Sequence, residues 1–321
     1  MIADTLERVR ALASDLDVWV LTARDLQGAV REAVPAVPAA HVVGEPQGKN
    51  TAPAIALASW WLRGAGPEAV AVVLPSDHRI EPAERFCEEV RAAARIALDR
   101  AAIVTFGIPP ARPETGYGYI ESGAAVAQGS PFHSVAAFRE KPDAATAERY
   151  ASDGRHLWNA GIFVFPPEVM LAELRAHAPE IARLVEALPP EPGPGVGGAL
   201  ERYYAAAPSI SIDYAVMERS RRALVARAGF AWDDVGSWAA LGGASAEHDE
   251  AGNVARGRAL LQDCSGVIAF GEGGLIAALG VSNLVIVRAG DVTFVCPRDR
   301  AQDVRSIVAR LDGEEDLRGF R

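Results

Sequence analysis

Three short polar motifs carry side chains that could bind phosphate, sugar or metal. Lys49 and Asn50 are adjacent and precede an apolar helical stretch, Asp77 ends an apolar run, and Glu140 stands next to Lys141. Of the 32 basic residues, only Lys49 and Lys141 are lysines. A drift of the genome towards arginine explains that scarcity. Against such a drift, the two lysines are candidates for positions where a compact ammonium is wanted.

The stretch EPQGKNTAP at 45–53 lies between an expected strand and an expected helix. The N-terminus of a helix presents N–H groups without partners and a partial positive charge, and both favour phosphate. Lys49 would add a point charge there, and Asn50 and Thr51 could contact a base or a ribose. An ordinary capped helix explains the same residues, and on spacing alone that interpretation is favoured.

Asp77 in LPSDH and Asp234 in WDDVGSW are candidate ligands for Mg²⁺. A carboxylate at the carboxyl end of a strand commonly holds this ion against substrate phosphates. The alternatives are a turn at Asp77 and a turn between packed tryptophans at Asp234, with Asp233 as the other ligand of that pair. If they share one ion, the carboxylates of Asp77 and Asp234 lie within about 6 to 7 Å of each other.

Other motifs could line a site for a sugar phosphate. Gly118 in GYGYI could let the backbone approach a ligand, although a hairpin with aromatic contacts explains the same residues. In FREKP, neighbouring strand residues point to opposite faces, so Glu140 and Lys141 need not pair. One of them could meet sugar hydroxyls while the other meets a phosphate. Asn159 and Gly161 begin a further apolar strand in WNAGIF.

The elements that would position these motifs alternate between β-like runs and helical patterns over the first two-thirds of the chain. This alternation predicts βαβ units and a mostly parallel sheet, with binding residues at the carboxyl ends of its strands. The expected elements are strands at 18–22, 69–75 and 101–108, and helices at 51–63, 82–98 and 210–222. After about residue 252, short strands separated by turn residues predict a small β-rich domain that ends in a helix.

Composition excludes several classes of protein. The chain has 321 residues, 50% of them hydrophobic and 23% charged, which is typical of a globular protein of about two domains. A net charge of −10 argues against binding to nucleic acid. No apolar run reaches the roughly 18 residues of a membrane span, and the N-terminus lacks a signal peptide. Three cysteines form neither a disulfide framework nor a zinc pattern. We therefore expect a cytoplasmic protein.

Taken together, the motifs resemble the sugar nucleotidyltransferases, and within them the mannose-1-phosphate guanylyltransferases. The resemblance runs from about residue 5 to residue 311, and EPQGKNTAP is its most discriminating part. The other matching stretches are LPSDH, GYGYIE, FREKPD, WNAGIF, SIDYAVME, WDDVGSW, GNV, LGVSNLVIV and CPRDRAQDV. The resemblance implies a Rossmann-like nucleotidyltransferase domain at 1–250 and a short β-helix-like domain at 251–321. The longer family members carry an appended isomerase domain.

The same resemblance implies the transfer of GMP from GTP to mannose 1-phosphate, giving GDP-mannose and pyrophosphate, with Mg²⁺ as cofactor. It implies catalytic roles for Asp77, Lys141 and Asp234, the two aspartates being the metal ligands. The implied substrate-binding residues are Lys49, Asn50 and Thr51 on the nucleotide side and Gly118, Glu140, Asn159, Gly161 and Asp213 on the sugar side. The resemblance implies no binding to membranes or to nucleic acids, and it leaves open whether the protein forms a homodimer.

The sequence departs from the family pattern at its start. Family members open with a strand and a glycine-rich loop, GGxGTRLWPLS, whose arginine binds the leaving pyrophosphate. Residues 1–321 contain no such segment, and Met1 falls in the helix that would follow it. About one βα unit, on the order of 30 residues, is thus lacking. We expect impaired activity, from a misplaced start codon or a truncated gene rather than an evolved minimal enzyme.

Two other functions are kept open. One is a non-catalytic homologue that binds sugar nucleotides or oligomerises through its C-terminal domain. The other is guanylyl transfer to a different hexose or heptose 1-phosphate.

Overall fold

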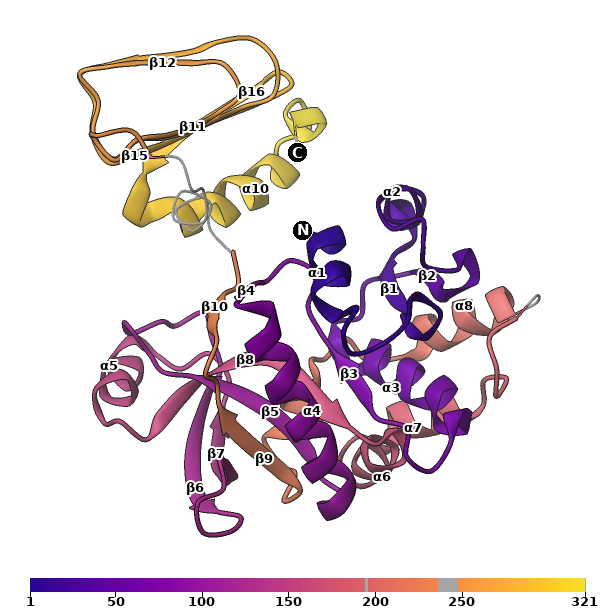
Figure 1. The fold of residues 1–321 in the computed structure, drawn as a ribbon. Helices are drawn as coiled ribbons and strands as arrows, with labels where there is room; N and C mark the ends of the chain where they lie inside the picture. Colours follow the sequence, from indigo (N-terminus) through magenta and orange to yellow (C-terminus); the bar gives the residue numbers. More distant parts are fainter. Residues whose placement is uncertain (194–195, 236–247, 321) are drawn as a thin grey trace. The chain divides into compact units, whose positions relative to one another are not determined.

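The computed structural model describes residues 1–193, 196–235 and 248–320 (Figure 1). The chain divides into two compact units, Met1–Trp232 and Asp233–Arg321. No helix in these described ranges is long and apolar enough to cross a lipid bilayer. Each unit has its own apolar core, so each is described by itself below.

The first unit is built on a six-stranded sheet with the order β3–β8–β5–β9–β7–β6. Its strands are β3 (Ala71–Val73), β5 (Ile103–Ile108), β6 (Tyr119–Ala125), β7 (Phe132–Arg139), β8 (His156–Phe165) and β9 (Ala223–Arg227). Strands β3, β5, β9 and β6 share one direction, and β8 and β7 run against them. The expected Rossmann-like α/β fold is confirmed, with two reversed strands that the alternation of elements did not reveal.

Two smaller sheets complete the first unit. Strands β1 (Val20–Ala23) and β2 (Val42–Glu45) pair in parallel and are joined through helix α2 (Gln27–Ala33). The short strand β4 (Arg79–Glu81) pairs with β10 (Ala231–Asp233). Helix α1 (Ile2–Val9) precedes them.

Helices cover both faces of the large sheet because its central strands are apolar on both faces. All six residues of β5 are buried, as a run of Ile, Val and Phe predicts. One face packs against helix α4 (Ala83–Arg100). The other packs against α3 (Thr51–Leu62), α6 (Pro167–His177), α7 (Pro179–Glu186) and α8 (Val196–Ala206). Helix α5 (Ala144–Ser152) lies between β7 and β8 in the sequence.

The helix expected over 210–222 is much shorter in the structure. Only a five-residue π-helix forms, at Asp213–Met217. The prediction fails because the residues before it bond elsewhere: the N–H of Ile210 donates to the carbonyl of Lys49, and the N–H of Ile212 donates to Oγ1 of Thr51.

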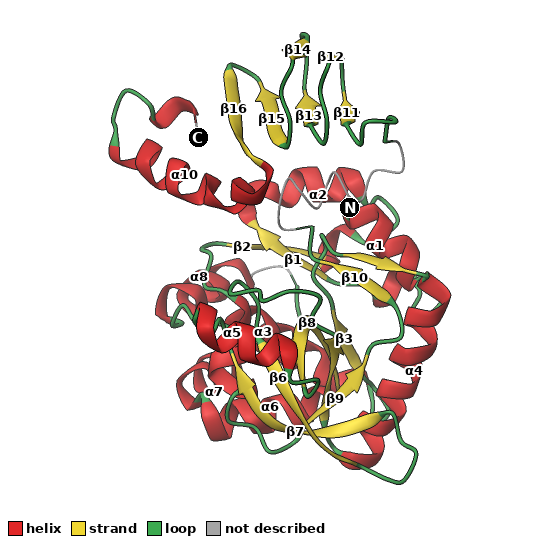
Figure 2. Cartoon of the chain, turned by 90° about the vertical axis from the view of Figure 1, so that its left-hand side faces the viewer, coloured by secondary structure: helices red, strands yellow, loops and turns green. Residues whose placement is uncertain are grey.

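The second unit consists of short strands that stack in parallel (Figure 2). Strands β11 (Val254–Arg256), β13 (Ile268–Gly271) and β15 (Leu284–Ala289) pair in parallel, and β12 (Ala259–Gln262) pairs in parallel with β14 (Ile276–Leu279). Strand β16 (Val292–Pro297) closes the first of these sheets in antiparallel fashion, and helix α10 (Val304–Gly313) follows. The expected β-rich, β-helix-like region is confirmed.

Asn253 holds the first turn of this stack together. Its side chain is 5% exposed. Nδ2 donates to the carbonyl of Cys264 and to Oδ2 of Asp249, both at 2.9 Å, and Oδ1 accepts from the N–H of Val267 at 2.9 Å. One amide therefore satisfies backbone groups on two sides of a buried corner.

We predict that Asn253→Ala lowers the free energy of unfolding of the second unit by about 2 to 4 kcal/mol, because it leaves two buried backbone groups without partners. Differential scanning calorimetry of the full chain measures this loss. The matched control is Gln262→Ala, which removes an exposed amide from β12 and should change stability by less than about 0.5 kcal/mol. Equal effects of the two substitutions would contradict the role of Asn253.

Candidate active site

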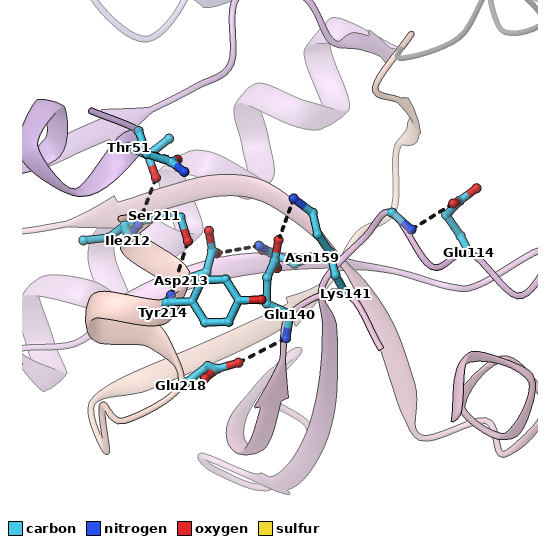
Figure 3. Close-up of polar contacts among 12 residues, drawn as sticks. Thr51, Glu114, Glu140, Lys141, Asn159, Ser211, Ile212, Asp213, Tyr214 and Glu218 are labelled. Atoms are coloured by element: carbon cyan, nitrogen blue, oxygen red, sulfur yellow. Dashed lines mark hydrogen bonds and ion pairs between the residues drawn. The ribbon is translucent and has the colours of Figure 1, made fainter. Parts of the chain in front are cut away.

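Side chains from three elements meet beside the large sheet (Figure 3). Glu140 directly follows β7, Asn159 lies in β8, and Asp213 is the first residue of the π-helix. Nδ2 of Asn159 donates to Oδ1 of Asp213 at 3.0 Å. The fold thus brings together three residues for which the family resemblance implies a place on the sugar side, although they are far apart along the chain.

The amide of Asn159 is oriented by its own neighbours. Its Oδ1 accepts from Oγ1 of Thr105 at 3.1 Å and from the N–H of Gly161 at 3.2 Å. Because the oxygen accepts two bonds, the nitrogen must face Asp213. Gly161 has a φ of +68°, a value that favours glycine, and it sits where the pairing of β8 with β5 shifts register.

Glu140 lies directly against Gly118. A Cβ atom at position 118 would be 2.5 Å from Oε2 of Glu140 and 3.4 Å from Cβ of Asn159. The carbonyl of Gly118 also accepts from the N–H of Asn159 at 2.8 Å. The absent side chain therefore makes room for a protein carboxylate, whereas the sequence suggested room for a ligand.

Lys141 folds back towards Glu140, with 3.7 Å between Nζ and Oε1. These two residues were not expected to pair, since adjacent residues of a strand point to opposite faces. The alternation ends because β7 stops at Arg139 and Lys141 adopts a left-handed conformation with a φ of +46°. The side chain of Lys141 is 59% exposed and that of Glu140 only 12%. The ammonium is accordingly accessible to a ligand, above a mostly buried carboxylate.

The surroundings of the site favour the protonated, neutral form of its buried carboxyl groups. Burial, together with the nearby Asp213 and Glu218, raises the pKa of Glu140 to about 7 against the opposing effect of Lys141. Burial also raises the pKa of Asp213 above its ordinary range, opposed by hydrogen bonds that include the one from Asn159. Clustered carboxyl groups of this kind can accept from, or donate to, the hydroxyl groups of a sugar.

The start of α3 is a capped helix, which is the structural alternative considered for EPQGKNTAP. Oδ1 of Asn50 accepts from the N–H of Thr51 at 2.9 Å, and the N–H of Ala52 donates to the carbonyl of Ile210 at 3.1 Å. Pro53 has no N–H to offer. The first N–H groups of the helix are therefore engaged within the protein. Any phosphate here would have to be bound by side chains such as that of Lys49.

The loop with Asp77 is anchored from several directions. Oγ1 of Thr5 donates to the carbonyl of Ser76 at 3.1 Å, and Arg8 donates to the carbonyl of His78 at 3.0 Å. Nε1 of Trp232 donates to Nδ1 of His78 at 3.0 Å, so the other ring nitrogen of His78 carries the proton in its neutral form. Asp77 itself is exposed at the end of this fixed loop.

The first acid of the WDD motif, Asp233, forms a turn. Oδ1 of Asp233 accepts from the N–H of Val235 at 2.7 Å, which forms a turn at a valine with a φ of +48°. Asp233 is thus the turn-forming carboxylate of the pair. Asp234 belongs to the second unit and Asp77 to the first. The ion that they are expected to share stays a prediction.

Metal chemistry is compatible with the donor set. In the described parts of the chain, no three His, Cys, Asp or Glu side chains gather as a ready-made metal cage. Mg²⁺ rarely uses such a cage: it is typically held by one or two carboxylates together with waters and substrate phosphates. An exposed aspartate on an anchored loop, such as Asp77, fits that mode of binding.

Two contributors to the site were not singled out in the sequence. Oε1 of Glu218 accepts from the backbone N–H of Glu140 at 3.2 Å. Thr105 is a fully buried polar residue that orients Asn159. A threonine within an otherwise apolar buried strand was the available signal for the second. No local sequence signal indicated the contact of Glu218 with Glu140, because the π-helix that connects Asp213 to Glu218 was not expected.

Comparisons with known proteins find two matching families. Residues 1–251 match the family described as nucleotidyl transferase, and residues 257–311 match a mannose-phosphate isomerase/GMP-like beta-helix domain. The xanthan biosynthesis protein XanB of Xanthomonas campestris is 41% identical over 275 residues, which cover 83% of this chain and 56% of that protein. A mannose-1-phosphate guanylyltransferase of Klebsiella pneumoniae is 39% identical over 274 residues, covering 84% of this chain and 58% of that protein.

A solved structure is also similar over nearly the whole chain. The protein named mannose-1-phosphate geranyltransferase from Thermus thermophilus superposes with a TM-score of 0.84 at 34% identity, covering 97% of this chain and 89% of that one. By contrast, this chain spans little more than half the length of the curated relatives that it matches.

We predict that Glu140 makes the fold less stable as pH rises. A carboxyl group with a raised pKa in the folded state stabilises the fold below its ordinary pKa of 4.5, and this contribution is lost as pH rises to about 7. The full effect is on the order of 3 kcal/mol. Glu140→Gln should therefore raise the melting temperature at about pH 8 more than at about pH 5, measured by thermal unfolding.

The control for this experiment is Glu148→Gln, which changes the net charge equally at an exposed position on α5. An identical dependence on pH in wild type and Glu140→Gln would contradict the buried role of Glu140.

Proposed function

The chain belongs to the nucleotidyl transferase family, and on that premise we propose that it transfers GMP from GTP to mannose 1-phosphate. The products are GDP-mannose and pyrophosphate. The names of the Klebsiella pneumoniae relative and of a Vibrio cholerae relative, 37% identical over 283 residues, support this choice of substrates. The observation that carries the proposal is an exposed lysine above a buried cluster of carboxyl and amide groups beside the large sheet.

The sugar-side residues have complementary roles in this proposal. Glu140, Asp213 and Asn159 exchange hydrogen bonds with the hydroxyl groups of mannose. Gly118 leaves room for Glu140, and Gly161 adopts the positive φ that accompanies the shift of register between β8 and β5. Lys141 meets the phosphate of mannose 1-phosphate with its exposed ammonium.

The chemistry is an in-line attack by a phosphate oxygen of mannose 1-phosphate on the α-phosphorus of GTP. Catalysis then consists mainly of positioning and of neutralising charge. Lys141 orients the attacking phosphate and lowers the repulsion between two anions. On the nucleotide side, Lys49 contacts phosphate, and Asn50 and Thr51 contact the guanosine.

Asp77 and Asp234 are proposed to hold Mg²⁺, which would neutralise phosphate charge when it is bound. The proposed location is the cytoplasm, where both substrates occur as soluble metabolites, and a homodimer stays a prediction. A non-catalytic homologue that binds sugar nucleotides is kept as the second candidate function. Transfer to another hexose or heptose 1-phosphate is a variant of the first function.

We predict that Lys141→Met weakens the binding of mannose 1-phosphate by about 10- to 100-fold, because the phosphate loses a charge-assisted contact. The affinity for GTP should change by less than about twofold, well under the tenfold that corresponds to 1.4 kcal/mol. Lys141→Arg should also bind more weakly, since a planar fork does not replace a compact ammonium. Isothermal titration calorimetry of the full chain with each ligand measures both effects.

The matched control is Arg149→Met, an equal change of charge on exposed α5. Wild-type affinity for mannose 1-phosphate in Lys141→Arg would show that the lysine has no specific role and that genome composition alone explains its rarity.

We also predict that residues 1–321 by themselves turn over GTP and mannose 1-phosphate slowly. Loss of a single preorganised hydrogen-bond donor to a charge that develops in the transition state lowers the rate by about 10²- to 10³-fold. A pyrophosphate-release assay should compare this chain with a version extended by any in-frame codons upstream of Met1. Equal rates in the two would refute the prediction, and binding of both ligands without turnover in either would favour the non-catalytic function.

A further inference from the structure

Residues 210–218, here called the linking segment, bond to both proposed substrate sides within the first unit. At its start, the N–H of Ile210 donates to the carbonyl of Lys49 at 3.2 Å, and the carbonyl of Ile210 accepts from the N–H of Ala52 at 3.1 Å. The N–H of Ile212 donates to Oγ1 of Thr51 at 2.9 Å. These three bonds fix the beginning of the segment to the start of α3.

The other end of the linking segment is bonded to the sugar-side cluster. Asp213 accepts from Nδ2 of Asn159, and Oε1 of Glu218 accepts from the backbone N–H of Glu140. Between them, the N–H of Glu218 donates to the carbonyl of Asp213 at 2.9 Å, which closes the wide turn of a π-helix. Such single π-turns occur frequently at functional sites.

Of the three bonds at the start of the segment, the one that Ile212 donates to Thr51 is accepted by a side chain. Ile212, whose N–H it holds, is 1% exposed and directly precedes Asp213. A buried N–H needs a partner, and here the partner is a hydroxyl, so a residue with an acceptor is needed at position 51 to satisfy the N–H of Ile212. Thr51 itself is exposed, so replacing it does not disturb the core.

We propose that Thr51 is a positioning residue for the sugar side: its hydroxyl fixes Ile212 and thereby places the carboxylate of Asp213 against Asn159. The hydroxyl hydrogen of Thr51 stays available to a nucleotide, because the bond from Ile212 uses only a lone pair. One threonine therefore serves both substrate sides. This inference rests on the proposed function for its ligands, although the link between Thr51 and Asp213 is a property of the fold.

The consequence is thermodynamic coupling between the two ligands. A nucleotide that orders the start of α3 also orders the linking segment, and mannose 1-phosphate held by Asp213 orders it from the other end. Because coupling between sites is reciprocal, each ligand should raise the affinity for the other by the same factor.

The experiment compares Thr51→Val, which keeps the shape and removes the acceptor, with Thr51→Ser, which keeps the acceptor. Thr146→Val is the control, because the hydroxyl of Thr146 accepts from Arg149 on α5 and touches neither substrate side. Calorimetry of each full chain measures the affinity for mannose 1-phosphate with and without GTP. Hydrogen exchange of peptides covering 210–218 reports on the segment itself.

The expected result for Thr51→Val is an affinity for mannose 1-phosphate about tenfold weaker, together with loss of the coupling to GTP and faster exchange across 212–218. Thr51→Ser should restore all three, and Thr146→Val should resemble wild type. Thr51→Ala replaces Thr51→Val if the latter does not fold.

Two outcomes overturn the proposal. One is that Thr51→Val weakens the binding of GTP alone, while the affinity for mannose 1-phosphate stays within about twofold of wild type. The other is faster exchange at Ile212 only, with residues 213–218 protected as in wild type. If wild type binds neither ligand, the proposed function fails, but the exchange experiment still decides whether Thr51 positions Asp213.

Discussion

The side-chain amide of Asn159 is the contact on which the site depends. Its oxygen accepts hydrogen bonds from a hydroxyl of β5 and a backbone N–H of β8, and its nitrogen donates a hydrogen bond to Asp213 on the π-helix. Its own backbone N–H is bound by the carbonyl of Gly118. An aspartate in its place would set a fourth carboxylate beside Glu140, Asp213 and Glu218. The neutral amide is thus the group that lets acidic residues assemble here with only one lysine nearby.

The cluster shows the strain that functional sites accumulate. Lys141 and Asn50 adopt left-handed conformations that cost non-glycine residues free energy, and Glu140 and Asp213 are buried with raised pKa values. None of this stabilises the first unit, whose core lies between the sheet and its helices. The arrangement is therefore explained better by ligand binding than by folding, because the hydroxyl groups of a bound sugar can supply hydrogen-bond donors to the buried carboxyl groups.

The sequence predicted the elements better than the contacts between them. The apolar run around β5, the capped start of α3 and the turn-separated strands of the second unit follow directly from local patterns. The reversed direction of β8 and the π-helix at Asp213 do not, because they depend on hydrogen bonds between distant residues such as Thr51 and Ile212. Likewise, glycine at 118 was predicted to matter, but its reason is the carboxylate of Glu140, which only the folded chain brings there.

Charge sets a last constraint on recognition. With a net charge of −10, the whole chain repels the phosphates that it is proposed to bind. At physiological salt this repulsion is screened beyond about 8 Å, so it slows encounter without deciding affinity. Affinity must come from cations within that distance of the bound phosphates. In a chain with only two lysines, an ammonium exposed directly above the acidic cluster supplies such a charge, and its partial pairing with Glu140 keeps it in place until a phosphate arrives.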